Sequence, residues 1–125
     1  MTLREKQSAF LVNVAKLILW ADTQGYQLTG GELGRTTDQQ ILYYRGYTIK
    51  DENGIISLVK ANKLSKTMDS KHLKKLAIDL YLFKNNKYIS SNDEYKPLAE
   101  FWVSLHPDNV AGYYWNFDGN HFEMK

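Results

Sequence analysis

The chain contains no cysteine. Without thiols it can form no disulfide bond, offer no thiolate to a metal ion and use no cysteine as a nucleophile. Any metal site in this protein must therefore be built from histidine, aspartate and glutamate side chains. The absence of cysteine does not by itself decide the compartment in which the protein works.

Long apolar runs are also missing. The apolar part of residues 11–21 is interrupted by Asn13 and Lys16, and a membrane-spanning helix needs about 20 apolar residues in a row. We therefore expect no membrane insertion. Charged residues at positions 4–6 are followed by no small-residue cleavage site, so we expect no signal peptide and synthesis in the cytoplasm.

The length and composition indicate one globular domain. The 125 residues are 43% hydrophobic and 14% aromatic, which is enough to bury a core without disulfide bonds and is unlike a disordered chain. We expect a single domain over residues 1–125, present as a monomer.

Positive charge is concentrated in one part of the chain. The net charge is only +2, yet residues 60–87 hold eight lysines against two acidic residues, Asp69 and Asp79. A patch of this kind attracts polyanions, and nucleic acid and an anionic cell wall are both candidates. The alternative is a solvated face that keeps the domain in solution.

Three helices are expected from capping patterns followed by apolar residues at helical spacing. Residues 2–24 begin with a Thr2–Glu5 capping box, and a second helix begins at Thr36 or Thr37 and ends near residue 45. A third helix, capped by a Ser91–Glu94 box, is expected to end at His106. This histidine is interpreted as a partner of the helix dipole and not as a metal ligand.

Short strands are expected between and after these helices. They are predicted at residues 26–29, 76–83, 87–89 and 121–124, the second and third forming a hairpin. Two structures are predicted as alternatives for the segment 46–66: an Asn-Gly hairpin, or a loop that wraps the site. The aromatic residues of the tail, 109–125, could close the core or line a groove. The fold class is therefore α+β, with helices packed on a small antiparallel sheet.

The most informative stretches are residues 70–79 and 118–123. They supply two histidines, His72 and His121, and the carboxylate of Asp79 inside an apolar run. Two histidines and one carboxylate, with one coordination position left open, are the ligands of many catalytic zinc sites. A lone carboxylate is costly to bury unless it is paired or binds a metal. A lysine from the neighbouring cluster is the alternative partner for Asp79.

The spacing of the first two residues sets a condition on the fold. His72 and Asp79 are seven positions apart, which would put them on opposite faces of a strand or about 10 Å apart along a helix. They meet at one ion only if His72 lies in a loop that curls back over the strand carrying Asp79. On spacing alone, the alternative is a solvated histidine and an ordinary strand aspartate.

The pattern of these stretches resembles a known family. Their spacing is Ser70-x-His72-x-x-Lys75-x-Ala77-x-Asp79 and Asp118-x-x-His121-x-Glu123. This is similar to the motif of the zinc peptidases of peptidoglycan, which include D-Ala-D-Ala carboxypeptidases and dipeptidases and the phage L-alanyl-D-glutamate endopeptidases (endolysins). The segment 28–40 is similar to the part of that family that carries its substrate-facing arginine.

The resemblance implies a role for each matching residue. Zinc (Zn2+) would be the cofactor, with the catalytic base placed three residues before the last histidine. The implied zinc ligands are His72, Asp79 and His121, the implied base is Asp118, and the implied substrate contacts are Arg35 and Ser70.

The resemblance also implies the substrate. It is the peptidoglycan stem peptide, and an L-Ala-D-Glu endopeptidase of phage or prophage origin is preferred over a D-Ala-D-Ala carboxypeptidase. Such an enzyme would reach the cell wall only after release by a holin-type route. No nucleic acid is expected as a partner.

The chain departs from the family pattern at two places. Lys75 stands where the family has a glycine, so the lysine either adopts the same tight turn or the turn differs. Trp115 and Asn116 stand where many members have a Trp-Gly-Gly-like loop. The open alternatives are a wall-binding module without turnover and a basic module that binds nucleic acid.

Overall fold

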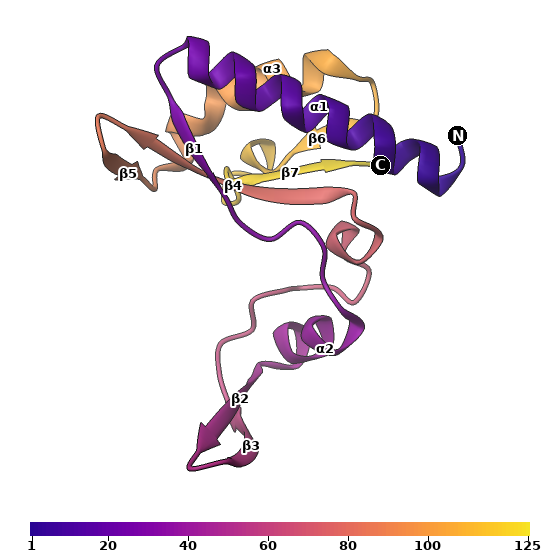
Figure 1. The fold of residues 1–125 in the computed structure, drawn as a ribbon, viewed down its shortest axis with the longest axis vertical. Helices are drawn as coiled ribbons and strands as arrows, with labels where there is room; N and C mark the ends of the chain where they lie inside the picture. Colours follow the sequence, from indigo (N-terminus) through magenta and orange to yellow (C-terminus); the bar gives the residue numbers. More distant parts are fainter.

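The computed structural model describes residues 1–125 as an α+β fold. Three helices pack around a five-stranded antiparallel sheet, and a separate two-stranded hairpin stands away from it (Figure 1). The helices are α1 (Leu3–Thr23), α2 (Thr37–Arg45) and α3 (Lys96–Leu105). The strands are β1 (Gln27–Gly30), β2 (Tyr47–Glu52), β3 (Ile55–Lys60), β4 (Ala77–Lys84), β5 (Lys87–Ile89), β6 (Asn109–Ala111) and β7 (His121–Met124). The predicted fold class is confirmed.

Strand β4 is the centre of the main sheet. The strand order is β1-β4-β7-β6, and β5 also pairs with β4 through the hairpin turn at Asn85 and Asn86. All five buried positions of β4 and its preceding residue are apolar, and β4 receives β1 on one edge and β7 on the other. The apolar run at 76–83, predicted as a strand, is therefore the strand against which the rest of the sheet assembles.

The core lies between the sheet and helices α1 and α3, which lie side by side (Figure 1). Phe10 and Leu17 of α1 and Trp102 of α3 are fully buried. The rings of Phe10 and Trp102 meet edge to face with centroids 5.6 Å apart, and the indole N–H of Trp102 donates to the carbonyls of Val110 and Glu123. Helix α3 is thereby tied to β6 and β7.

Helix α1 forms as predicted but its buried stripe is narrower than the spacing suggested. The Thr2–Glu5 capping box is present. Leu11 and Ile18 are exposed, and Leu19 is 68% exposed. The reason is that α1 packs on one side only, so residues at the edge of its apolar face have no neighbour.

The predicted start of the third helix is wrong. Ser91 makes no capping hydrogen bond, and residues Asn92–Tyr95 form a 3₁₀ turn before α3 begins at Lys96. Pro97 explains the later start, because proline lacks an N–H and is tolerated only in the first turn of a helix. The 3₁₀ turn buries Tyr95, whose hydroxyl accepts a hydrogen bond from the amide of Leu82 at 3.0 Å.

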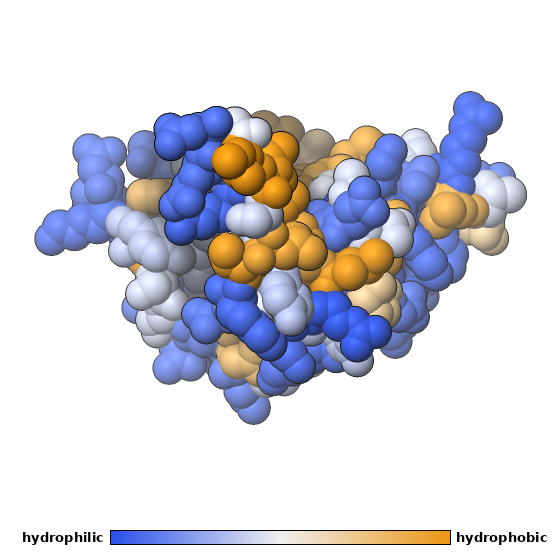
Figure 2. All heavy atoms as spheres, turned by 90° about the horizontal axis from the view of Figure 1, so that it is seen from below, coloured by the Kyte–Doolittle hydropathy of each residue, from blue (hydrophilic) through white to orange (hydrophobic).

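Segment 46–60 forms the hairpin and not the loop. Helix α2 is capped by Thr36 and ends at Gly46 in the left-handed conformation, and β2 and β3 then pair around Asn53 and Gly54, both with positive φ. Seen from below, the end of the molecule that carries α2 and this hairpin mixes apolar and charged surface (Figure 2). The large apolar side chains that the hairpin exposes are Ile49, Ile55, Ile56 and Leu58.

The aromatic tail divides between the two predicted roles. Phe122 of β7 is fully buried in the core, whereas Trp115 and Phe117 are exposed and line the main cavity. His106 ends α3 as predicted, but its Nδ1 accepts a hydrogen bond from the amide of Asp108 at 3.0 Å. None of the helices combines the length and hydropathy required to cross a bilayer.

The turn before β4 shows how the chain accommodates Lys75 at the position where the family has a glycine. Residues Lys71–Lys74 form a 3₁₀ turn, and Lys75 then adopts the left-handed conformation with φ 58° and ψ 38°. The lysine therefore accepts the tight turn that a glycine would make without strain. This turn reverses the chain so that it enters β4.

Replacing Lys75 with glycine is expected to stabilise the fold, because it removes the steric cost of a β-carbon at positive φ. The free energy of unfolding should rise by up to about 1 kcal/mol, less than the full strain because glycine is more flexible in the unfolded chain. Lys75→Ala keeps the β-carbon and serves as the control, with little change expected. Urea denaturation of the two variants measures the difference, and a less stable Lys75→Gly protein would contradict the strain argument.

Candidate metal centre

The pairing of β4 with β7 places two of the predicted site residues together. Asp79 lies directly opposite His121 in the antiparallel register. Side chains at directly opposed positions project from the same face of a sheet, with β-carbons about 5 Å apart. The two residues, 42 positions apart along the chain, therefore meet because of strand register and not because of loop geometry.

His72 reaches the same place from the turn before β4. Ser70 opens this turn, its hydroxyl accepting the amide hydrogen of His72 at 3.2 Å. The carbonyl of His72 accepts hydrogen bonds from the amides of Arg35 and Lys75, at 3.1 and 3.2 Å. The turn folds back on the strand and buries His72, which is 3% exposed. His72 therefore lies in a turn that curls back over the strand carrying Asp79, as the seven-residue spacing of the two residues required.

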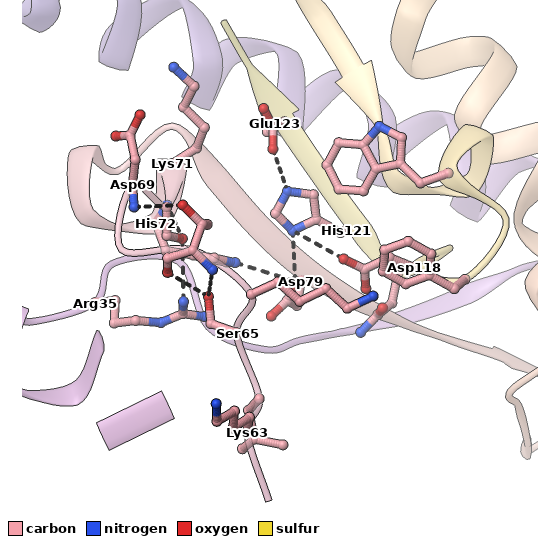
Figure 3. A pocket seen from close by; sticks show the side chains of 17 residues that line it. Arg35, Lys63, Ser65, Asp69, Lys71, His72, Asp79, Asp118, His121 and Glu123 are labelled. Carbon is pink, nitrogen blue, oxygen red and sulfur yellow. Dashed lines mark hydrogen bonds and ion pairs between the residues drawn. The ribbon is translucent and has the colours of Figure 1, made fainter. Parts of the chain in front are cut away.

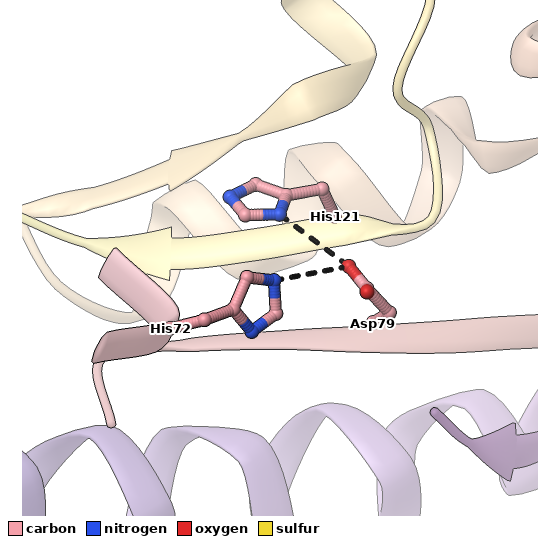
Figure 4. Close-up of side chains that lie close together, drawn as sticks. All are labelled: His72, Asp79 and His121. Atoms are coloured by element: carbon pink, nitrogen blue, oxygen red, sulfur yellow. Dashed lines mark ion pairs between the residues drawn. The ribbon is translucent and has the colours of Figure 1, made fainter. Parts of the chain in front are cut away.

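The three side chains converge on one point (Figure 4). His72 Nε2 lies 3.5 Å and His121 Nδ1 lies 3.4 Å from Asp79 Oδ1. One ligand atom from each residue lies within 4.8 Å of the other two. A tetrahedral zinc site with bonds of 2.0–2.1 Å requires ligand atoms roughly 3.3–3.4 Å apart. Two of the three separations, at 3.5 and 3.4 Å, are already close to this value.

Hydrogen bonds outside the group fix which nitrogen of each histidine faces inward. His72 Nδ1 lies 3.0 Å from the carbonyl oxygen of Leu33, and His121 Nε2 lies 2.8 Å from Glu123 Oε1. Both partners can only accept, so these nitrogens carry the protons. The other nitrogens, His72 Nε2 and His121 Nδ1, then face Asp79 and are the atoms that can bind a metal ion once they have lost their protons. Outer hydrogen bonds of this type orient histidines that bind metal ions, so the residues present fit a zinc ion.

The electrostatics of the group favour a cation. Burial raises the pKa of Asp79, but the hydrogen bonds from His121 and His72 outweigh it and hold that pKa at about 2. Burial lowers the pKa of His121, while its bonds to Asp79 and Glu123 raise it to about 9. Positive charge is thus stabilised between the carboxylates, and a metal ion competes with the proton of His121 for that place.

Asp118 lies beside this group. Its Oδ2 is 4.0 Å from His121 Nδ1, and the side chain is 36% exposed. Burial is the main cause that raises the pKa of Asp118, and the charge of Asp79 adds to it, although His121 acts in the opposite direction. Gly112 permits this placement, because a β-carbon there would come within 2.1 Å of the Asp118 carbonyl oxygen. A half-buried carboxylate with a raised pKa is suited to accept a proton.

Arg35 and Ser70 lie next to each other in the wall of the same cavity (Figure 3). The Arg35 side chain is only 9% exposed, and its Nε is paired with Glu32. Its Nη1 donates to Gln40 Oε1 at 2.7 Å and to Ser70 Oγ at 3.3 Å. The guanidinium is therefore held rigidly, and Nη2 is the nitrogen with no partner in the protein.

Three residues at the site had been given no role from the sequence. Glu32 holds Arg35, Glu123 holds His121, and Gln40 is fully buried. Gln40 donates to Ser65 Oγ at 2.9 Å and to the Thr67 carbonyl at 2.6 Å, which ties the segment after β3 to α2. Glu32 and Glu123 lie within three residues of their partners, so their positions inside the matching segments were the available signal, whereas Ser65 and Thr67 lie far from Gln40 along the chain.

The site opens into a cavity of about 460 Å³. Its walls come from Arg35, from the segment 63–72 between β3 and β4, and from the segment 115–123 that leads into β7 (Figure 3). The ring of Trp115 packs against His121 with centroids 5.3 Å apart. The metal-ligand group is therefore buried on one side and accessible to a ligand on the other.

Comparison with known proteins identifies the fold. No family model matches the chain, and no curated protein sequence matches it. Among solved structures, the chain is similar to the crystal structure of the L-Ala D-Glu endopeptidase ChiX of Serratia marcescens, with a TM-score of 0.64 and 20% identity. The similarity covers 92% of this chain and 77% of that one. The chain therefore shares the fold of that endopeptidase.

Zinc binding by the group predicts a clear difference among the three histidines of the chain. His72→Ala and His121→Ala each remove a ligand and should lower zinc affinity at least about 100-fold, beyond the effect of losing an outer hydrogen bond. His106→Ala is the matched control and should leave affinity unchanged, because His106 bonds only to Asp108. Calorimetric titration of the apoprotein with zinc measures all three. Equal losses for all three variants would contradict the assignment.

Proposed function

We propose that this chain is a zinc-dependent peptidase that hydrolyses a peptide bond in the stem peptide of peptidoglycan. The observation that carries the proposal is the convergence of His72, Asp79 and His121, with both inward nitrogens facing the Asp79 carboxylate, beside Asp118 in an open cavity. The fold shared with an L-Ala D-Glu endopeptidase supports it.

The residues divide the reaction between them. A bound zinc ion supplies Lewis-acid polarisation of a carbonyl and lowers the pKa of a water molecule. Asp118 accepts the proton of the attacking water and delivers it to the nitrogen of the departing amine, so that the peptide bond breaks as the new bond to oxygen forms. His72 and His121 are held in the required tautomers by Leu33 and Glu123.

Arg35 and Ser70 are proposed to contact the substrate. Both line the cavity beside His72, and the partners of Arg35 hold its guanidinium in one place with Nη2 available. A donor fixed in this way can bind a carbonyl oxygen as negative charge develops on it, without first having to reorient. Ser70 also caps the turn of His72. The same side chain is therefore proposed to contact the substrate and to help to hold a zinc ligand in place.

The bond that we propose is cut is the one between L-Ala and D-Glu. The sequence motif and the activity of the structurally similar endopeptidase ChiX both favour it over a D-Ala-D-Ala carboxypeptidase. We further propose that residues 1–125 act as one peptidase domain and that the protein is of phage or prophage origin, acting on the cell wall after release. These finer statements rest on the motif.

Asp118→Ala tests the assignment of the base. Zinc affinity should stay within about threefold, because Asp118 is no ligand, whereas lysis of purified cell walls should fall by about 10²-fold or more. Asp22→Ala, at an exposed aspartate near the end of α1, is the control and should lyse walls like the wild type. Turbidity of wall suspensions and mass spectrometry of the fragments give the readout.

Two results would contradict the proposal in different ways. Unchanged lysis by Asp118→Ala would remove Asp118 from the mechanism. A zinc-loaded wild type that binds cell walls but releases no fragments would identify a wall-binding module on a peptidase fold.

A further inference from the structure

The fold divides the lysine cluster of residues 60–87 into two groups. Lys63, Lys66 and Lys71 line the cavity of the metal centre, and two of them are labelled in Figure 3. Lys84 and Lys87 face each other where the β4–β5 hairpin turns, and they do not line the cavity. The charge patch seen in the sequence is therefore in part a feature of the site. We call Lys63, Lys66 and Lys71 the cavity lysines.

The cavity lysines have no acidic partner. No carboxylate lies within ion-pairing distance of any of them, although Asp69 belongs to the same segment. Lys66 Nζ instead lies 4.6 Å above the ring of Phe117 on the other side of the cavity. All three cavity lysines therefore line the cavity without an acidic partner for their charge.

Four carboxylates line the cavity, and all of them except Asp69, which stands among the cavity lysines, lie at the metal centre. Asp79 faces both histidines, Asp118 lies beside His121, and Glu123 bonds its outer nitrogen. The cavity therefore has a carboxylate-rich end that suits a cation. It also has a wall, formed by residues 63–71, on which the net charge of the side chains is positive. A separation of this kind orients a ligand that carries negative charge away from the bond to be cut.

Arg35 does not supply this positive charge. Its charge is balanced by Glu32, and its side chain is 9% exposed. It can donate a hydrogen bond from Nη2, but an incoming anion gains little net attraction from a guanidinium that is already paired. The unpaired positive charge at the cavity comes from the lysines.

We propose that the cavity lysines form a subsite for a free carboxylate of the substrate peptide. This proposal rests on the peptidase function proposed above and specifies its substrate. A glutamate joined to its neighbour through one carboxyl group keeps the other, so a peptide with an L-Ala–D-Glu bond carries such a carboxylate next to that bond. Because ammonium groups on flexible stems act as point charges, the subsite selects for charge and not for exact geometry.

The test compares two peptides that differ in one group. Both contain the L-Ala–D-Glu bond, and the remaining carboxyl group of the glutamate is free in one and a carboxamide in the other. In the triple variant Lys63→Gln, Lys66→Gln, Lys71→Gln, kcat/KM for the carboxylate peptide should fall about tenfold through KM, since each exposed ion pair contributes only several-fold. The carboxamide peptide should change less than about twofold, and added salt should reduce the difference between the peptides.

The matched control is the double variant Lys84→Gln, Lys87→Gln. It removes charge from the same cluster but outside the cavity, and it should handle both peptides like the wild type. If it loses as much activity toward the carboxylate peptide as the triple variant, general attraction by the cluster accounts for the effect and the subsite is wrong. If the triple variant cleaves both peptides like the wild type, the subsite proposal is also wrong, but the proposed peptidase function is not affected.

Binding separates this proposal from the proposed function. The two peptides are titrated by calorimetry into zinc-loaded Asp118→Ala protein, with and without the three lysine substitutions. A preference for the carboxylate peptide that the lysine substitutions abolish supports the subsite, even if the wild type cleaves neither peptide and the peptidase proposal fails. Equal binding of both peptides by Asp118→Ala overturns the subsite whether or not cleavage occurs.

Discussion

The antiparallel pairing of β4 with β7 is the constraint on which the site depends. Register places Asp79 opposite His121, and a slip of one residue would turn the histidine to the other face of the sheet. The register is held by burial, because Phe122 and Met124 on β7 and Leu80 on β4 are all within the core. The geometry of the metal centre is thus maintained by apolar packing on either side of it.

The remaining parts of the site attach to this strand pair by hydrogen bonds. The turn of His72 is joined to the segment before α2 through Arg35 and Leu33, and Gln40 joins α2 to the segment after β3. The amides of Gly31 and Asp79 exchange hydrogen bonds with the carbonyls of Asp79 and Glu32. The lower part of the molecule, which holds α2 and the hairpin (Figure 1), is thereby connected to the metal centre.

Much of this could be predicted from the sequence because it depends on local patterns. One acid inside an apolar strand drew attention to Asp79, and the alternation of β7 put His121 in reach of it. The helix cap at Thr2 was predicted correctly, and Thr36 and the Asn-Gly hairpin were each one of two alternatives named, because these features depend on neighbours in the chain. The Ser91–Glu94 box had the same local pattern but failed, since Pro97 fixed where the helix could begin.

What the sequence could not predict depends on partners far away along the chain. The proton position on His72 is set by the carbonyl of Leu33, and every residue type has such a carbonyl. The bonds of Gln40 to Ser65 and Thr67, and the presence of only some lysines at the cavity, follow from the path of residues 61–74. The sequence left open whether Lys75 adopts the tight turn of the family's glycine, and its positive φ shows that it does.

The most direct measurement is anomalous diffraction at the zinc absorption edge from crystals of the zinc-loaded protein. The account predicts one strong peak bonded to His72 Nε2, His121 Nδ1 and an oxygen of Asp79, at zinc–ligand distances of about 2.0–2.2 Å. Glu123 should remain hydrogen-bonded to His121 and off the metal. A peak bound through the other nitrogen of either histidine, or no peak between the two strands, would contradict it.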